Sequence, residues 1–279
     1  MVVTLVGEVV TADHPVGHVD DPMFLRGDGV FETLLVRDGR ACLLEAHLER
    51  LGRSAAIVGL PRPDLDRWRV ATLAASARWA EGSEAVLRMV LGRNRDGGAT
   101  GFVAVSELPD RVLASRRDGV SAITLDRGLT AGGPTTTSWS VTGAKSLSYA
   151  VNAAALRHAD RLGNGDVVLV SADGFVLEGP RSSVVIADEN GSLATPPTTM
   201  PILPGTTVQA LFDVARARGT SCEERPLRVE DLSAAQGVWL LSSVTLAARV
   251  HTLDGQRLPM ANAAVEVTAL VDDAVARDR

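Results

Sequence analysis

Lysine is almost absent from this chain of 279 residues. Its 28 basic residues include one lysine, Lys145, in the stretch TGAKSLSYAVN, so the other 27 are arginine. Codon usage alone can replace surface lysines by arginine and leave one by chance. A lysine amine, however, can lose its proton when desolvated and then attack a carbonyl, which an arginine guanidinium does not do. Lys145 is therefore a candidate nucleophile.

Cysteine and long apolar runs are also scarce. Cys42 and Cys222 lie far apart without metal-ligand spacing, which excludes a disulfide framework and predicts two reduced packing residues. No metal site is expected, and the histidines His14, His18, His158 and His251 are interpreted as surface or packing residues. No segment approaches the length of a membrane span, and the start MVVTLVGEVV lacks a basic leader-like region. These absences predict a soluble, cytoplasmic protein that does not act at a membrane.

Excess positive charge is missing as well. The formal net charge is −6 and the isoelectric point is about 5.4. A nucleic-acid binder needs a basic surface to neutralise phosphates, so this class is excluded. A small anionic ligand remains possible, because it needs only local positive charge. With 46% hydrophobic and 22% charged residues, the chain can bury a substantial core.

Strand and helix patterns alternate in both halves, which predicts an α+β protein of two domains. GVFETLLVRDGRACLL reads as a hairpin turned at Asp38-Gly39, and EAHLERLGRSAAIVGL has helical spacing. In the second half, SLSYAVNAAALRHADRLG and TVQALFDVARARG read as helices, while DVVLVS, SVVIAD and GVWLLSS read as strands. The Gly/Thr/Pro-rich stretch near 121–136 is the expected linker between a smaller domain at 1–120 and a larger one at 137–279.

The segment LPGTTVQALFDVA is a candidate phosphate site. Gly205, Thr206 and Thr207 open a helix, where backbone N–H groups, two hydroxyls and the positive end of the helix dipole suit an anion. Ordinary capping of the helix by threonine is the alternative.

Two further charged residues fit such a site. Glu178 ends an apolar strand in GFVLEGPRSS, where a carboxylate beside a pyridine ring could keep the ring nitrogen protonated; a solvated loop acid is the alternative. Arg50 shares a helix face with His47, and its guanidinium is a natural partner for phosphate, although helix salt-bridging is the usual role. An amine, an anion site and an acid together are what pyridoxal 5'-phosphate chemistry requires.

The order of these motifs resembles the fold-type IV pyridoxal phosphate enzymes, also called class IV aminotransferases. The matching stretches are RGDGVFETLLVRDGR…HLERLGRSA, AKSLSYA, DGFVLEGPRSSVVI and ILPGTTVQALFDVA. That family includes branched-chain aminotransferases, D-amino acid aminotransferases and 4-amino-4-deoxychorismate lyases. The resemblance implies a small N-terminal and a large C-terminal domain that meet at the cofactor, usually in a homodimer.

The resemblance also implies roles for individual residues. Lys145 bonds to the cofactor aldehyde and then moves protons at the substrate carbon, and Glu178 pairs with the pyridine nitrogen. Further cofactor contacts fall on residues matched by motif: Arg50, Gly205, Thr206, Thr207 and Ser243 at the phosphate, and Tyr149 at the phenolic oxygen, with helix packing as the alternative for Tyr149. Ser183 is also assigned to the cofactor, although it stands where family members commonly carry Asn. The GPR that follows Glu178 replaces small residues, so the pattern of this loop departs from the family.

The choice of reaction depends on substrate residues. Phe31, Arg88 and Arg93 are assigned to the substrate, and AVLRMVLGRNRDGG is similar to the strand of aminodeoxychorismate lyases in which basic residues precede a Gly-rich loop. Several cations there suit a small substrate with two carboxylates, although arginines are scattered throughout this chain. SSVTLAARVHTLDG lacks the Glu-Ile-Thr-Pro pattern that resembles the aminotransferase branches, which favours the lyase.

The sequence thus predicts that 4-amino-4-deoxychorismate is converted to 4-aminobenzoate, a folate precursor, and pyruvate. Lys145 removes the ring proton at the amine-bearing carbon, and pyruvate leaves as the ring becomes aromatic. A D-amino acid aminotransferase, which could coexist as a second activity, and then a branched-chain aminotransferase are the alternatives among enzymes. A catalytically inactive scaffold of the same fold is the non-enzyme alternative, and the retained single lysine argues against it.

Overall fold

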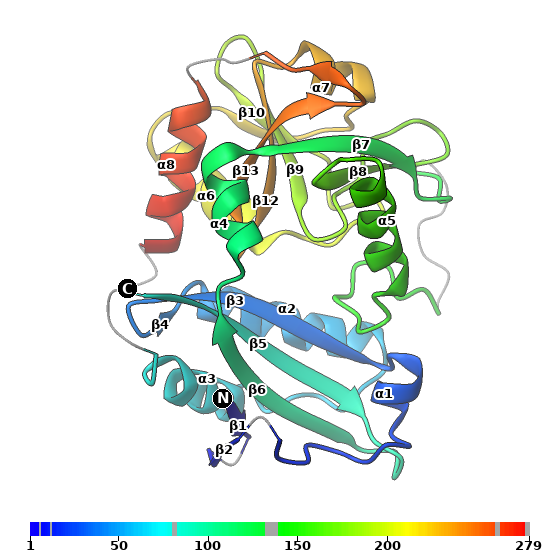
Figure 1. The fold of residues 1–279 in the computed structure, drawn as a ribbon, viewed down its shortest axis with the longest axis vertical. Helices are drawn as coiled ribbons and strands as arrows, with labels where there is room; N and C mark the ends of the chain where they lie inside the picture. Colours follow the sequence, from blue (N-terminus) through cyan, green and yellow to red (C-terminus); the bar gives the residue numbers. More distant parts are fainter. Residues whose placement is uncertain (6, 12, 80–82, 132–138, 260–262, 277–279) are drawn as a thin grey trace. The chain divides into compact units, whose positions relative to one another are not determined.

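The computed structural model describes residues 1–5, 7–11, 13–79, 83–131, 139–259 and 263–276, and the chain divides into two compact units (Figure 1). The first unit comprises Met1–Pro109 together with Gly143–Tyr149, and the second comprises Asp110–Thr142 and Ala150–Arg277. Each unit has its own sheet and its own buried apolar core. The predicted two-domain α+β architecture is confirmed.

The first unit contains an antiparallel sheet of six strands in the order β2-β1-β6-β5-β3-β4. Asp38 and Gly39 both have positive φ, 52° and 72°, and form the two-residue turn that the Asp-Gly pair predicts between β3 and β4. The elements of this unit are β1 (Val2–Thr4), β2 (Val9–Val10), α1 (Pro22–Arg26), β3 (Gly29–Arg37), β4 (Arg40–Ala41), α2 (Leu44–Ile57), α3 (Leu65–Ser76), β5 (Glu84–Arg93) and β6 (Ala99–Glu107).

One face of β3 packs toward α2 and carries an unusual residue. Val30, Leu34 and Val36 are buried in a core with Leu48 and other residues of α2 and α3. Because side chains alternate between the two faces of a strand, residue 32 points to this same apolar side. The residue there is Glu32, which is fully buried. A buried carboxylate requires polar partners, and these belong to the candidate site described below.

The second unit contains a mixed sheet in the order β11-β10-β9-β12-β13-β7-β8, with β14 paired to β13. The pairs β10–β11, β13–β7 and β7–β8 are parallel, and the remaining pairs are antiparallel. Its strands are β7 (Val120–Asp126), β8 (Asp166–Val170), β9 (Ser183–Ala187), β10 (Leu193–Thr195), β11 (Cys222–Glu224), β12 (Gly237–Ser242), β13 (Leu246–Leu253) and β14 (Gln256–Arg257).

The helices of the second unit pack on this sheet. Helix α6 contacts α8 and β12, α4 contacts β13, and α5 contacts β7 and β8. They are α4 (Asp110–Asp118), α5 (Ala150–Arg161), α6 (Thr206–Ala217), α7 (Val229–Ala234) and α8 (Ala263–Ala276). Strands β9 and β10 form an antiparallel hairpin around Asn190-Gly191.

The expected linker and the structure differ in one respect. The stretch VSAITL forms a strand, β7, which lies between β13 and β8 in the sheet of the second unit and covers the start of the linker expected at 121–136. Its alternating burial explains why it joins a sheet rather than a linker. Residues 132–138 of that linker lie outside the described residues.

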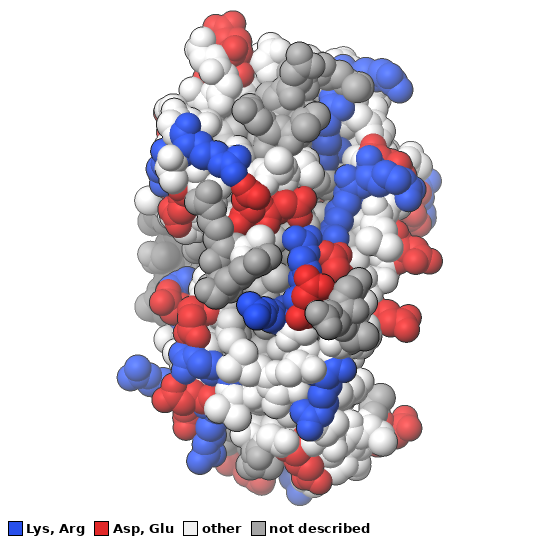
Figure 2. Space-filling model, turned by 90° about the vertical axis from the view of Figure 1, so that its left-hand side faces the viewer, with Lys and Arg blue, Asp and Glu red and all other residues white. Residues whose placement is uncertain are grey.

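Three further observations concern the cysteines, the helices and the surface charge. Cys42 and Cys222 are both free thiols, as predicted. Within the described ranges no helix combines the length and apolar character needed to cross a membrane. On the face shown in Figure 2, basic and acidic side chains are interspersed rather than separated by sign.

Candidate active site

The segment that carries Lys145 is part of the first unit and pairs with the start of β3. The backbone N–H of Phe31 donates to the carbonyl of Lys145 at 2.9 Å, and the N–H of Leu147 donates to the carbonyl of Gly29 at 2.8 Å. These bonds form an isolated antiparallel bridge next to β3. Because the backbone at Lys145–Leu147 bonds to a strand, α5 begins at Ala150 and not at Ser146 as the sequence predicted.

Gly29 permits this close pairing. A Cβ atom on Gly29 would lie 2.6 Å from Cδ1 of Leu147 and 2.8 Å from Cα of Gly92, distances that no real side chain tolerates. The glycine in the RGDGVFE motif is therefore required by the approach of the Lys145 segment and of β5.

The side chain of Lys145 lies beside the ring of Phe31, which in turn contacts Tyr149. Its Nζ is 4.8 Å from the centroid of the Phe31 ring, within the range of a cation–π contact. The rings of Phe31 and Tyr149 meet edge to face, with centroids 5.7 Å apart. The structure thus brings Phe31, Lys145 and Tyr149 together.

The sequence assigned two arginines of β5 to the substrate, and the structure places them on opposite faces. Thr33 pairs with Arg88 and Phe31 pairs with Val90, so Arg88 is exposed on the sheet face that carries Phe31. Residue 93 has the other parity and points to the opposite face.

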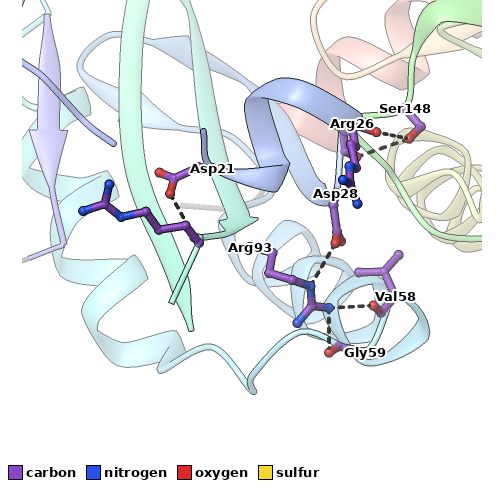
Figure 3. A network of polar contacts seen from close by, with 9 residues as sticks. Asp21, Arg26, Asp28, Val58, Gly59, Arg93 and Ser148 are labelled. Atoms are coloured by element: carbon purple, nitrogen blue, oxygen red, sulfur yellow. Dashed lines mark hydrogen bonds and ion pairs between the residues drawn. The ribbon is translucent and has the colours of Figure 1, made fainter. Parts of the chain in front are cut away.

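Arg93 has several hydrogen-bond partners on that opposite face (Figure 3). Its Nε donates to Oδ2 of Asp28 at 2.9 Å, and its Nη2 donates to the carbonyl of Gly59 at 3.0 Å and more weakly to that of Val58. These carbonyls follow the C-terminus of α2, where a cation is favourable. Arg93 therefore connects β5 to Asp28, which directly precedes β3, and to the residues that follow α2.

Arg50 is buried on α2 and belongs to a polar cluster with Glu32 and His47. Its Nε donates to Oε1 of Glu32 at 2.8 Å and its Nη2 donates to Oε2 at 2.7 Å. Nδ1 of His47 lies 2.7 Å from the same Oε2. The sequence predicted the Arg50 site but missed Glu32. The sequence feature that could have revealed Glu32 is a carboxylate at a core-facing position of an apolar strand.

The second unit carries Glu178 and the predicted phosphate site. Oε2 of Glu178 accepts the backbone N–H of Leu203 at 3.1 Å, and the carbonyl of Glu178 accepts the N–H of Leu169 at 2.8 Å. Leu203 directly precedes Pro204-Gly205 and the start of α6. One hydrogen bond therefore connects the Glu178 carboxylate to the segment that leads into α6.

The N-terminus of α6 has the features of an anion site. Gly205 is the N-cap residue and its helix has no side-chain cap hydrogen bond. Thr206 and Thr207 are buried, and Oγ1 of Thr207 makes no hydrogen bond within the described part of the chain. A buried hydroxyl without a partner is costly, so this position suits a ligand that accepts its hydrogen bond.

Two serines of the second unit were also predicted to contact the cofactor. A Cβ atom on Gly205 would lie 2.5 Å from Oγ of Ser183, so the Ser183 hydroxyl lies at the start of α6 and only glycine fits beside it. Ser243 lies in the turn between β12 and β13. Arg116 of α4 stabilises this turn, because its Nε and Nη2 donate to the carbonyl of Val244 at 3.1 and 2.5 Å.

The GPR sequence after Glu178 has a structural explanation. Nη2 of Arg181 lies 3.3 Å from Oδ2 of Asp166, and the carbonyl of Pro180 accepts Nδ2 of Asn152 at 2.7 Å. Burial raises the pKa of Asp166, and Arg181 partly opposes that rise. Of these two contacts, the ion pair of Arg181 depends on the departure from the family pattern, whereas the Pro180 contact uses only the backbone.

Comparison with known proteins identifies the family. The class IV amino-transferase profile matches residues 29–253. A bifunctional aminodeoxychorismate lyase / D-amino acid transaminase from Mycobacterium tuberculosis is 58% identical, with all of both chains covered.

Two solved structures are similar over nearly the whole chain. A hypothetical aminotransferase from Mycobacterium tuberculosis in its PLP-bound form has a TM-score of 0.97 and 58% identity, with complete coverage of both chains. A fold IV transaminase from Curtobacterium pusillum has a TM-score of 0.88 and 40% identity, over 97% of this chain and 91% of the other. The resemblance seen in the motifs is confirmed, and the chain belongs to the class IV aminotransferase family of fold-type IV enzymes.

Proposed function

We propose that this enzyme is a pyridoxal 5'-phosphate-dependent 4-amino-4-deoxychorismate lyase that forms 4-aminobenzoate and pyruvate. The observation that carries the proposal is full-length 58% identity to a bifunctional lyase and transaminase, combined with the single lysine of the chain beside Phe31 and Tyr149. The orphan hydroxyl of Thr207 supports a phosphate at the start of α6.

In this proposal the cofactor would be held by the residues that the motifs assign to it. Lys145 would bond to the aldehyde, Glu178 would pair with the pyridine nitrogen and Tyr149 would contact the phenolic oxygen. The residues assigned to the phosphate are Arg50, Ser183, Gly205, Thr206, Thr207 and Ser243. The cofactor supplies an electron sink for the substrate carbon.

The protein groups then perform the proton transfers. Once the substrate amine has replaced Lys145 on the aldehyde, the freed lysine would take the proton from the amine-bearing ring carbon as a general base, and a proton would be returned to the departing pyruvyl group. Arg88, exposed on the sheet face that carries Phe31, is assigned to a substrate carboxylate, and Phe31 packs against the ring. Loss of pyruvate makes the ring aromatic and drives the reaction, so no keto acid is needed.

D-amino acid transamination is proposed as a second activity of the same site. The Mycobacterium tuberculosis relative supports it, since that protein is a bifunctional aminodeoxychorismate lyase / D-amino acid transaminase. Lys145 would serve both reactions, because each begins with removal of a proton from the amine-bearing carbon. A homodimer, based on family resemblance, and a cytoplasmic location, in keeping with two free thiols, are part of the same proposal.

The test is product formation without a keto acid. Purified enzyme loaded with pyridoxal phosphate is incubated with 4-amino-4-deoxychorismate, and 4-aminobenzoate is measured beside the Lys145→Ala variant. We expect product from the wild type only, and loss of the visible cofactor band in the variant. Product from Lys145→Ala at the wild-type rate would refute the role of the lysine. No product from a wild type with a normal cofactor spectrum would leave the transaminase as the main activity.

A further inference from the structure

Glu32 is the centre of a buried three-residue cluster. Its carboxylate accepts Nε and Nη2 of Arg50, at 2.8 and 2.7 Å, and contacts Nδ1 of His47 at 2.7 Å. Glu32 and His47 have no exposed surface, and Arg50 is 5% exposed. Such a cluster is costly to bury, because three polar side chains leave water, and a role beyond stability can account for it.

The charges in the cluster follow from its burial. Burial alone raises the pKa of Glu32, but the charge and hydrogen bonds of Arg50 and the contact with His47 outweigh it and hold that pKa well below its ordinary value. Burial lowers the pKa of His47, and Arg50 and Lys145 lower it further, against the opposing effect of Glu32. Glu32 is therefore ionised and His47 neutral, with Nδ1–H donating to the carboxylate.

The hydrogen bonds fix the orientation of the Arg50 guanidinium. Nε and Nη2 form one edge of the planar group, and both donate to Glu32. A guanidinium held along one edge keeps its plane and its direction fixed. Without Glu32, the long arginine side chain would adopt several rotamers, and a ligand would have to select one of them at an entropic cost.

We infer that Glu32 and His47 are positioning residues for the cofactor phosphate, acting through Arg50. Glu32 aims the guanidinium, and His47 holds the second carboxylate oxygen. This inference rests on the proposed function, in which Arg50 binds the phosphate. It predicts that Glu32 governs how well the protein distinguishes pyridoxal phosphate from pyridoxal, which has the same ring and aldehyde but no phosphate.

The experiment measures the affinities of the cofactor-free full-length protein for pyridoxal phosphate and for pyridoxal, followed by fluorescence quenching. For Glu32→Gln, which keeps the shape and removes the charge, we expect pyridoxal phosphate to bind at least about tenfold more weakly and pyridoxal to bind as in the wild type. Equal weakening of both ligands would indicate a merely structural role and overturn the inference.

Further variants complete the test. Arg50→Gln examines the proposed function itself: unchanged discrimination in this variant would mean that Arg50 does not bind the phosphate. Discrimination lost in Arg50→Gln and kept in Glu32→Gln would overturn only the positioning role. His47→Asn places an amide nitrogen where Nδ1 stands and should retain discrimination, whereas His47→Leu should lose part of it.

Glu32→Asp is the alternative if Glu32→Gln does not fold, because it keeps the charge and shortens the side chain. It should show the same selective loss of affinity for pyridoxal phosphate. Affinity for both ligands as in the wild type would overturn the inference.

Discussion

The backbone N–H of Lys145 donates to Oγ of Ser54 at 3.1 Å, so the buried face of α2 fixes the main chain at the single lysine. Ser54 follows Arg50 by one helical turn on the same helix. Helix α2 therefore positions both the backbone of the lysine and the guanidinium of Arg50.

Replacing Ser54 by alanine should loosen the Lys145 segment. Because the substitution removes the acceptor of a backbone N–H, we expect the free energy of unfolding to fall by about 1–3 kcal/mol. We also expect kcat to fall more than KM rises, since the lysine moves protons rather than binding substrate carboxylates. Urea unfolding and steady-state kinetics measure the two effects.

Ser148→Ala is the matched control for this change. Ser148 lies at the exposed end of the same segment, where its hydroxyl donates to the carbonyl of Gly27 at 3.2 Å (Figure 3). An exposed bond of this kind should change stability by no more than about 0.5 kcal/mol. Equal kinetic effects of the two alanine variants would contradict the special role of Ser54.

Replacing Thr207 by valine should have opposite effects on stability and on cofactor binding. Valine has nearly the same shape and removes a buried hydroxyl that has no partner among the described residues, so the cofactor-free protein should be as stable as the wild type or more stable. Affinity for pyridoxal phosphate should fall about tenfold, because the phosphate loses a donor. Thermal unfolding without cofactor and a binding titration test both.

Thr195→Val provides the contrasting control. The Thr195 hydroxyl is also buried, but it donates to the carbonyl of Val184 at 2.7 Å. This variant should lose about 1–2 kcal/mol of stability and keep its cofactor affinity. A Thr207→Val protein that is destabilised and binds the cofactor normally would rule out the phosphate role of that hydroxyl.

The sequence predicted those parts of the fold that depend on local pattern. The Asp38-Gly39 turn, the start of α6 at Thr206 and the single lysine follow from residue type and spacing, and the structure contains the turn and the helix. It predicted α5 but began the helix at Ser146 instead of Ala150, because the N-terminal residues of that helical pattern bond to β3, a partner more than 100 positions earlier in the chain. Glu32 was missed for the same reason, since its partners are set by the packing of α2 on β3.

Arg93 and Arg88 were assigned to the substrate together, and variants can separate them. Arg93→Gln removes hydrogen bonds to Asp28 and Gly59, so we expect stability to fall by about 1–3 kcal/mol. Asp28→Asn should produce part of the same loss of stability.

Arg88 is exposed and makes a weak contact of 3.4 Å with Ser106. Arg88→Gln should therefore leave stability nearly unchanged while raising KM for the dicarboxylate substrate. Unfolding curves and KM values are compared; a raised KM for Arg93→Gln at wild-type stability would instead support substrate binding by Arg93.

The neutral state of His47 predicts a specific loss of stability in acid. The ordinary pKa of histidine is 6.5, and burial lowers the pKa of His47 in the folded protein. Below pH 6.5 the unfolded chain takes up a proton at His47 that the folded chain does not, so acidification favours unfolding, by at most about 1.4 kcal/mol per pH unit. Glu32, whose folded pKa is lowered from an ordinary value of 4.5, adds a similar loss only below pH 4.5.

His47→Asn isolates this effect, because asparagine keeps a donor at the place of Nδ1 and does not titrate. The free energy of unfolding is measured in urea between pH 5 and 8 for both proteins. The other histidines are common to both and cancel in the difference. We expect the stability advantage of the wild type over His47→Asn to shrink as the pH falls below 6.5, and to be constant above about pH 7.5. Two parallel curves across this range would mean that His47 carries the same charge in the folded and unfolded chain, and the neutral histidine assigned to the Glu32 cluster would be wrong.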